Sequence, residues 1–192
     1  MARRRVWMLL GGLTVLLVMG GLGVAAERWW QLNCSVDRPW LLVVNDPAGG
    51  ARYALVVTFR VTNPSDQPVY YFPHFTVTTE TGKLYRNVVD FAAERVAKQR
   101  LRRPLANVIE LIGELKPGET KEGIAVFSQP DPQADHYDLY AGGLTNEYKV
   151  VEQDGHSAVL RKVLLAEFYR PGDAYDVNLD KTYPVETRWV WR

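Results

Sequence analysis

Hydrophobic and polar residues alternate most regularly between Tyr53 and Thr79, with the period of two that is typical of β-strands. A polar stretch at 63–68 divides this segment, and its two prolines lack the amide donors that strand pairing requires. We therefore predict two strands, joined by a hairpin or by a corner between two sheets. The first strand is expected to bury one side and half-expose the other. The buried side carries Tyr53, Leu55, Val57, Phe59 and Val61, and the other carries Ala54, Val56, Thr58 and Arg60.

The second strand of this pair has aromatic residues on both of its faces. One face carries Val69, Tyr71, Phe75 and Val77, and the opposite face carries Tyr70, Phe72 and His74. A single core covers only one of these faces. Either a late hairpin or a helical segment packs over Tyr70, Phe72 and His74, or these three residues form an exposed surface that binds a partner. Pro73 indicates an edge or a bulge, because a central strand rarely accommodates proline.

Shorter apolar runs bounded by Pro, Gly, Asn and Asp predict the remaining strands. These strands lie at 38–45, 84–89, 123–127, 137–141, 147–153, 159–169 and 187–191. Asp154 and Gly155 form a strong turn signal, which makes 147–169 a C-terminal hairpin. Short strands joined by turns indicate an all-β fold, an antiparallel β-sandwich that occupies residues 36–192.

The hydrophobic period changes once, between residues 90 and 103. Ala93, Ala97 and Leu101 have helical spacing after a potential N-cap at Asp90, and Pro104 follows the segment. We predict a short helical insert at 90–103. The other faces of this helix carry five basic residues, Arg95, Lys98, Arg100, Arg102 and Arg103. They form either a solvated surface or a contact with an anion or a lipid headgroup near a membrane.

The N-terminal segment predicts contact with a membrane. Residues 6–26 carry no charge, and their length matches the ~20 apolar residues that cross a bilayer as one helix. Arg3, Arg4 and Arg5 precede this run and are expected to stay on the cytoplasmic side, so that 1–5 is a cytoplasmic tail. The domain that follows is therefore expected to be exported.

Two interpretations of residues 6–26 remain open. As an uncleaved signal anchor, favoured by its length and by Trp29 and Trp30 as an interfacial belt, the segment gives a single-pass protein of the inner (cytoplasmic) membrane. Residues 27–35 are then a linker to a periplasmic or extracellular domain. As a signal peptide cleaved near Ala26, the same segment gives a secreted domain.

Composition excludes several classes of protein. The formal net charge is +1, from 23 basic and 22 acidic residues, and three of the basic residues are Arg3, Arg4 and Arg5. The rest of the chain is close to neutral, which argues against a nucleic-acid partner, because that binding depends on many phosphate contacts. The single cysteine, Cys34, excludes an intramolecular disulfide. Cys34 is either a half-buried thiol or part of an intermolecular disulfide.

The sequence contains no pattern that predicts catalysis. It lacks the G-x-S-x-G, P-loop, G-x-G-x-x-G and H-E-x-x-H motifs. The histidines His74, His136 and His156 are far apart, and the acids Asp173 and Asp176 match no known calcium-binding loop. We therefore expect no enzymatic activity, no cofactor and no metal site.

Three segments, VVTFRVTNPSDQPV, FTVTTETGKLYRN and GELKPGETKEGIAVF, resemble the immunoglobulin-like extracellular domains of uncharacterised bacterial membrane-anchored proteins and lipoproteins. The resemblance covers roughly residues 50–141. It implies a non-catalytic sandwich that serves as an interaction or structural module of the cell envelope, with an envelope protein as partner. The helical insert and the tail 145–192 lie outside it. The alternative functions are a secreted small-ligand or metal-binding domain and, less favoured, an envelope hydrolase.

Overall fold

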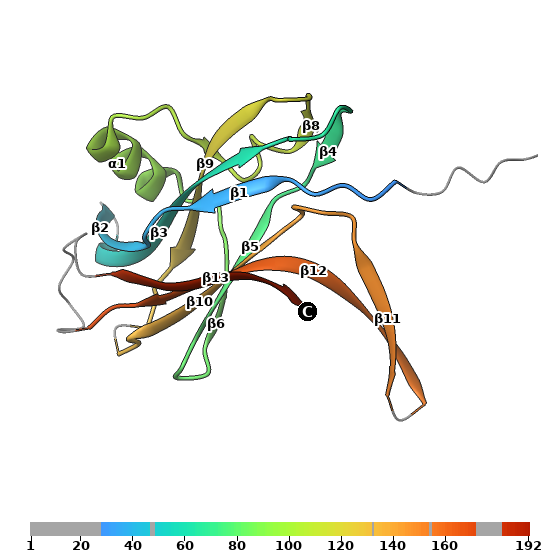
Figure 1. Ribbon diagram of the computed structural model, residues 1–192. Coiled ribbons are helices and arrows are strands. Elements are labelled where there is room, and N and C mark those ends of the chain that lie inside the picture. Colours follow the sequence, from blue (N-terminus) through green and yellow to red (C-terminus); the bar gives the residue numbers. More distant parts are fainter. Residues whose placement is uncertain (1–27, 47–48, 132, 154, 172–181) are drawn as a thin grey trace, which may run out of the picture.

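The computed structural model describes residues 28–46, 49–131, 133–153, 155–171 and 182–192. The predicted cytoplasmic tail and membrane segment, 1–5 and 6–26, lie outside this part of the chain. Among the residues described, no helix is both long and apolar enough to cross a bilayer. The architecture is an all-β sandwich of two sheets, with one helix packed on the outside of the first sheet (Figure 1).

The first sheet is built around a long central strand, β3 (Gly50–Thr62). Strand β9 (Thr120–Ser128) pairs with β3 along one edge. The other edge is occupied by β1 (Asn33–Val36) and β2 (Trp40–Asp46), one after the other. These pairs are antiparallel, whereas the short β7 (Ala106–Asn107) joins β9 in parallel.

The second sheet is built around β12 (His156–Tyr169). One edge of β12 pairs with β13 (Tyr183–Trp191), and the other pairs with β10 (His136–Gly142). Beyond β10 the sheet continues through two further strands, β5 (His74–Thr79) and β6 (Leu84–Arg86). A separate small ladder consists of β4 (Val69–Tyr71) and β8 (Gly113–Leu115).

The predicted hairpin at 147–169 is present, and its outer half forms a projecting arm. Strand β11 (Tyr148–Gln153) pairs only with residues 156–161 of β12, and together they extend away from the sandwich (Figure 1). The base of the arm contacts the rest of the molecule through one aromatic pair and one cation–π contact. The rings of Trp29 and Tyr148 lie 6.0 Å apart, and Lys149 Nζ lies 4.9 Å from the ring centre of Trp191.

The main core lies between the two sheets. Leu55, Val57 and Phe59 of β3 are buried there against side chains of the second sheet, and the rings of Phe59 and Phe75 lie 4.5 Å apart. Burial of one such side chain stabilises the fold by about 1.5–3 kcal/mol. The predicted inward face of the second strand is confirmed, because Val69, Tyr71, Phe75 and Val77 are all buried.

A second, smaller core lies beneath helix α1 (Phe91–Leu101). Ala93 and Ala97 of the helix pack against the outer face of the first sheet, which includes Trp40 and Val56. The prediction that one side of β3 is half-exposed is therefore partly wrong, because the helix buries Val56 on that side. The predicted N-cap is confirmed, and the helix ends earlier than residue 103, because Arg102 adopts the left-handed C-cap conformation (φ 51°).

Two further sequence predictions differ from the structure. The predicted linker 27–35 contains the fully buried Leu32 and most of strand β1, because β3 is long enough to pair with β1 and β2 in succession. The predicted strand at 69–79 is broken at Phe72 and Pro73 into β4 and β5, which belong to different ladders. Proline supplies no amide donor, so the break falls where the chain changes partners.

Candidate functional site

The face of Tyr70, Phe72 and His74 is exposed. The side chain of Tyr70 is 66% exposed and that of Phe72 is 56% exposed, and His74 is also at the surface. The prediction that the helix or the late hairpin covers them is wrong. Helix α1 packs on the outer face of the first sheet, and the arm extends away from the sandwich, so neither element covers these three residues. We call Tyr70, Phe72 and His74 the aromatic surface.

Two consecutive glycines support the aromatic surface from the neighbouring strand. Gly142 is the cross-strand partner of His74, and a Cβ atom at this position would lie 2.0 Å from His74 Nε2. The imidazole ring therefore lies directly over the glycine backbone. Gly143 has φ +77°, and a Cβ atom there would lie 2.0 Å from the carbonyl oxygen of Phe72. These close approaches leave no room for a side chain at either glycine.

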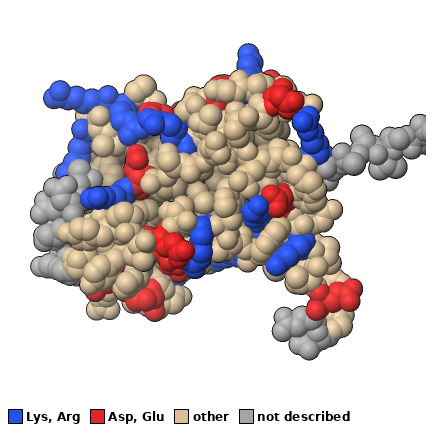
Figure 2. Space-filling model, viewed as in Figure 1, with Lys and Arg blue, Asp and Glu red and all other residues tan. Residues whose placement is uncertain are grey.

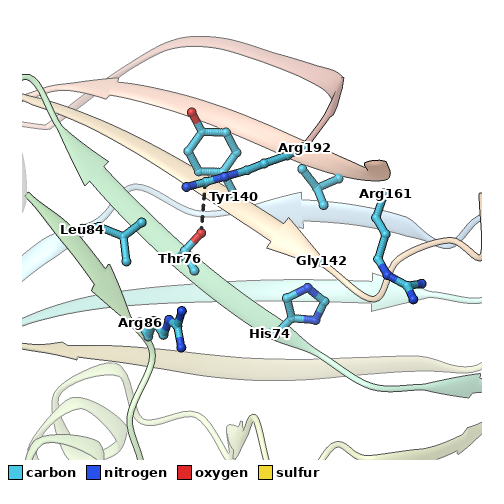
Figure 3. A pocket seen from close by; sticks show the side chains of 9 residues that line it. His74, Thr76, Leu84, Arg86, Tyr140, Gly142, Arg161 and Arg192 are labelled. Carbon is cyan, nitrogen blue, oxygen red and sulfur yellow. Dashed lines mark hydrogen bonds between the residues drawn. The ribbon is translucent and has the colours of Figure 1, made fainter. Parts of the chain in front are cut away.

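Two adjoining hollows lie along the outer face of the second sheet. The first, which we call the arginine hollow, has a volume of about 270 Å³ and includes His74, Arg86, Arg161 and Arg192 in its lining (Figure 3). The second has a volume of about 290 Å³ and extends from His74 to Phe72. Both hollows share His74, Arg161 and Val163, so the aromatic surface borders the arginine hollow.

The arginine hollow is positively charged. None of the residues that line it is acidic. The guanidinium of Arg192 lies 4.0 Å from the ring centre of Tyr140, and its Nη1 donates a hydrogen bond of 3.3 Å to Thr76 Oγ1 (Figure 3). Arg86 and Arg161 form no ion pair or side-chain hydrogen bond with the residues that the structure describes. Sequence reasoning missed this cluster, because its three arginines come from segments that lie far apart in the sequence.

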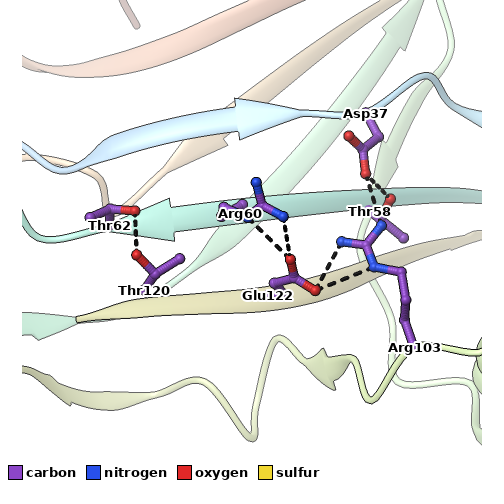
Figure 4. A network of polar contacts seen from close by, with 7 residues as sticks. All are labelled: Asp37, Thr58, Arg60, Thr62, Arg103, Thr120 and Glu122. Atoms are coloured by element: carbon purple, nitrogen blue, oxygen red, sulfur yellow. Dashed lines mark hydrogen bonds and ion pairs between the residues drawn. The ribbon is translucent and has the colours of Figure 1, made fainter. Parts of the chain in front are cut away.

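The five basic residues of the predicted helical insert do not form one site. Arg103 binds Glu122 at 3.0 Å and Asp37 at 3.4 Å, and Glu122 also binds Arg60 (Figure 4). The two arginines hold the pKa of Glu122 below its ordinary value through side-chain hydrogen bonds. This network attaches the end of the insert to the first sheet, which is a structural role.

The other basic residues of the insert are dispersed. Lys98 pairs with Glu94 at 3.6 Å, and the guanidinium of Arg100 lies 5.3 Å from the ring of Trp40. Basic side chains are visible over α1 at the upper left of Figure 2. Of the five, Arg95, Arg100 and Arg102 are exposed and form no ion pair with described residues.

Candidate chemical groups elsewhere do not form a site in the described part of the chain. No group of three or more His, Cys, Asp and Glu side chains is placed there to hold a metal ion. His136 stacks near Tyr169, with 4.7 Å between the ring centres, and Asp173 and Asp176 lie outside the described residues. Cys34 is half-buried, and burial raises the pKa of its thiol to about 12. A protonated thiol of this kind is unreactive at neutral pH.

No protein-family model matches this chain, and no curated protein matches its sequence. Among solved structures, the chain is similar to the 2.2 Å crystal structure of a conserved hypothetical protein from Bacillus anthracis. The similarity has a TM-score of 0.41 with 17% sequence identity, and it covers 62% of this chain and 91% of that chain. A likeness at this level assigns neither a family nor an activity.

Proposed function

We propose that this chain is a membrane-anchored, immunoglobulin-like domain of the bacterial cell envelope that binds a protein partner and performs no catalysis. The observation that carries the proposal is the exposure of Tyr70 and Phe72 where the chain passes from β4 to β5. Exposed aromatic side chains on a fixed backbone lose little conformational entropy on binding, and they commonly supply much of the affinity of protein interfaces.

The attachment of residues 28–32 to the domain supports a location close to the membrane. The backbone amide of Trp30 donates to Asn146 Oδ1 at 2.9 Å, and its carbonyl accepts from Thr145 Oγ1 at 2.6 Å. The proposed anchor at 6–26 ends two residues before Arg28. An uncleaved anchor would therefore hold the domain against the outer surface of the inner membrane rather than on a long tether.

The membrane part of the proposal is tested in cells. We expect the full chain to remain in the membrane fraction after carbonate extraction, and external protease to reach the domain once the outer barrier is opened. A soluble mature protein that begins at Glu27 would contradict the anchor and support the secreted alternative.

The partner-binding part is tested with a photo-crosslinking amino acid placed at Phe72. We expect one specific crosslinked product, which Tyr70→Ser removes while the free energy of unfolding stays within about 0.5 kcal/mol of the wild type, as for other exposed positions. The matched control is the same probe at Val159, which is 58% exposed on the arm and should not give this product. The same product from both positions, or none from Phe72, would contradict the proposal.

A further inference from the structure

The arginine hollow has a chemistry of its own, distinct from the aromatic surface that borders it. Its three guanidinium groups come from three different strands or strand ends, with Arg86 on β6, Arg161 on β12 and Arg192 after β13. In Figure 3 these side chains lie on different sides of the hollow, with Thr76 between Arg86 and Arg192 and the guanidinium of Arg192 against the ring of Tyr140. Strands β5, β6, β10 and β12 of the second sheet, together with Arg192 after β13, thus contribute to one charged depression.

No acidic side chain of the described residues pairs with the arginines of this hollow. The other arginine networks of this chain are neutralised, since Arg60 and Arg103 share Glu122, and Arg52 pairs with Asp90. Like charges that lie close together repel one another, and an anion bound between them relieves this repulsion.

Part of the hollow is preorganised. Arg161 and Arg192 exchange two backbone hydrogen bonds, of 2.8 and 3.0 Å, which places them directly opposite each other on adjacent strands. The ring of Tyr140 and the hydroxyl of Thr76 then hold the guanidinium of Arg192 in place. A guanidinium fixed in this way loses little entropy when it binds an oxyanion through its planar pair of N–H donors.

The size of the hollow selects the ligand. A volume of about 270 Å³ accommodates a small organic molecule but is below the usual range of pockets for drug-sized ligands. Leu84 and Val163 add apolar surface beside the arginines. The site therefore suits a compact molecule with a short carbon skeleton and more than one anionic group.

We propose that the arginine hollow binds a small, multiply charged oxyanion, with Arg86, Arg161 and Arg192 as the donors to its carboxylate or phosphate oxygens. The proposal goes beyond the protein-binding role of the aromatic surface and does not depend on it. Free carboxylates and free phosphates share this chemistry. An acidic side chain of a protein partner would use it too, and the experiment separates these sources.

Isothermal titration of the full chain in detergent micelles tests the site with citrate, inorganic phosphate and acetate. We expect citrate to bind most tightly and acetate most weakly, because affinity rises with the number of oxyanion groups that the arginines reach. Arg86→Gln and Arg161→Gln should each weaken citrate binding about tenfold, the usual effect of losing one charged hydrogen-bond donor. Added NaCl should weaken binding as well.

The matched control is Arg95→Gln, which removes an exposed, unpaired arginine from α1 on the other side of the molecule. This variant should bind citrate like the wild type. Citrate at about 100 times its Kd should also raise the Tm of the wild type by several degrees and that of Arg161→Gln by less. Unchanged Tm values in the absence of ligand show that all variants fold.

Three outcomes would overturn the proposal. One is no heat of binding for citrate or phosphate up to about 10 mM, well above the range of a specific small-molecule site. Another is equal weakening by Arg95→Gln and Arg161→Gln, which indicates only a general charge effect. The third is a wild type that binds no citrate together with an Arg161→Gln variant that loses the crosslink formed from position 72. That result assigns the hollow to an acidic group of the protein partner.

Discussion

The carboxylate of Asp131 joins the loop after β9 to the turn between β5 and β6. It is buried, accepts a hydrogen bond of 2.6 Å from Thr81 Oγ1, and pairs with Lys83 Nζ at 2.9 Å. These two contacts, with the Thr81 hydrogen bond first, lower the pKa of Asp131 to about 2. The ionised carboxylate therefore stabilises the folded state more than the unfolded state.

We predict that this stabilisation is lost in acid. A depressed pKa makes the contribution complete above the unfolded pKa, near 4, and removes it as the pH falls through the folded value of about 2. Asp131→Asn should lower the free energy of unfolding at pH 7 by about 1–2 kcal/mol, a figure reduced for the exposure of Lys83, and by much less at pH 2. Urea titrations across this pH range measure the difference.

The control for this prediction is Asp66→Asn. Asp66 pairs with Arg28 at 3.5 Å, but both side chains are largely exposed, so the substitution should change stability little at any pH. A constant difference between wild type and Asp131→Asn from pH 7 to pH 2 would show that the carboxylate charge is not the cause.

Among the structural elements, helix α1 depends on one residue at its beginning. Asp90 Oδ1 accepts a hydrogen bond of 3.1 Å from the amide of Ala93, and Asp90 Oδ2 pairs with Arg52 Nη1 at 2.6 Å. Arg52 also lowers the pKa of Asp90. The same side chain thus caps the helix and attaches it to β3.

We predict that Asp90→Ala destabilises the protein by about 1–2 kcal/mol, the usual range for loss of an N-cap, and that Asp90→Asn costs less. Asparagine keeps the cap but carries no charge for Arg52. Chemical denaturation gives the free energies, and hydrogen exchange of the α1 amides shows where protection is lost. Equal losses for the two variants would mean that the ion pair, not the cap, determines the effect.

The elements that could be predicted from the sequence are those specified locally. Helix α1 follows from Asp90 and the spacing of its alanines, and the inward face of β4 and β5 follows from strict alternation. The break at Pro73 was visible as an irregularity, but its meaning depends on β8 and β10, which pair with β4 and β5 from distant parts of the chain. Strand β1 is too short and polar to be recognised before its pairing with β3 is known.

The candidate site was predictable to a smaller extent. Alternation placed Tyr70, Phe72 and His74 on one face, but this face is exposed because α1 packs on the other sheet and the arm extends away from the sandwich. The arginine hollow brings together residues from 74 to 192, and each arginine alone resembles an ordinary solvated side chain of a strand. A cluster of this kind exists only through sheet register, which single-sequence patterns do not contain.

In the whole molecule, the helix and the candidate site occupy opposite sides. Helix α1 covers the outer face of the first sheet (Figure 1). The arginine hollow lies on the outer face of the second sheet, beside Phe72 and His74. The arginine hollow is therefore formed on strands that are held by the main core. Residues 28–32 reach the domain beside Thr145, which also lines the hollow next to Phe72. The proposed membrane attachment and the proposed binding surface are thus neighbours.

The folded unit should begin near residue 28 rather than at residue 36, where the sequence placed the start of the sandwich. Leu32 is fully buried, its amide donates to the carbonyl of Leu144 at 2.7 Å, and β1 completes the edge of β3. We predict that residues 28–192 fold on their own, and that a fragment of 36–192 is less stable by at least about 3 kcal/mol, from the buried leucine and the lost strand pairing. Urea denaturation of the two fragments measures this difference.

Leu32→Ala in the fragment 28–192 is the matched variant for this comparison. It keeps β1 but empties a buried position, so it should lose about 2–5 kcal/mol, as large-to-small core substitutions do. A chelator or a reductant should leave the Tm of 28–192 unchanged, because packing of the two cores and strand pairing account for the stability of the described domain. Equal stability of 36–192 and 28–192 would show that the N-terminal segment rests on the surface of the sandwich without contributing to its core.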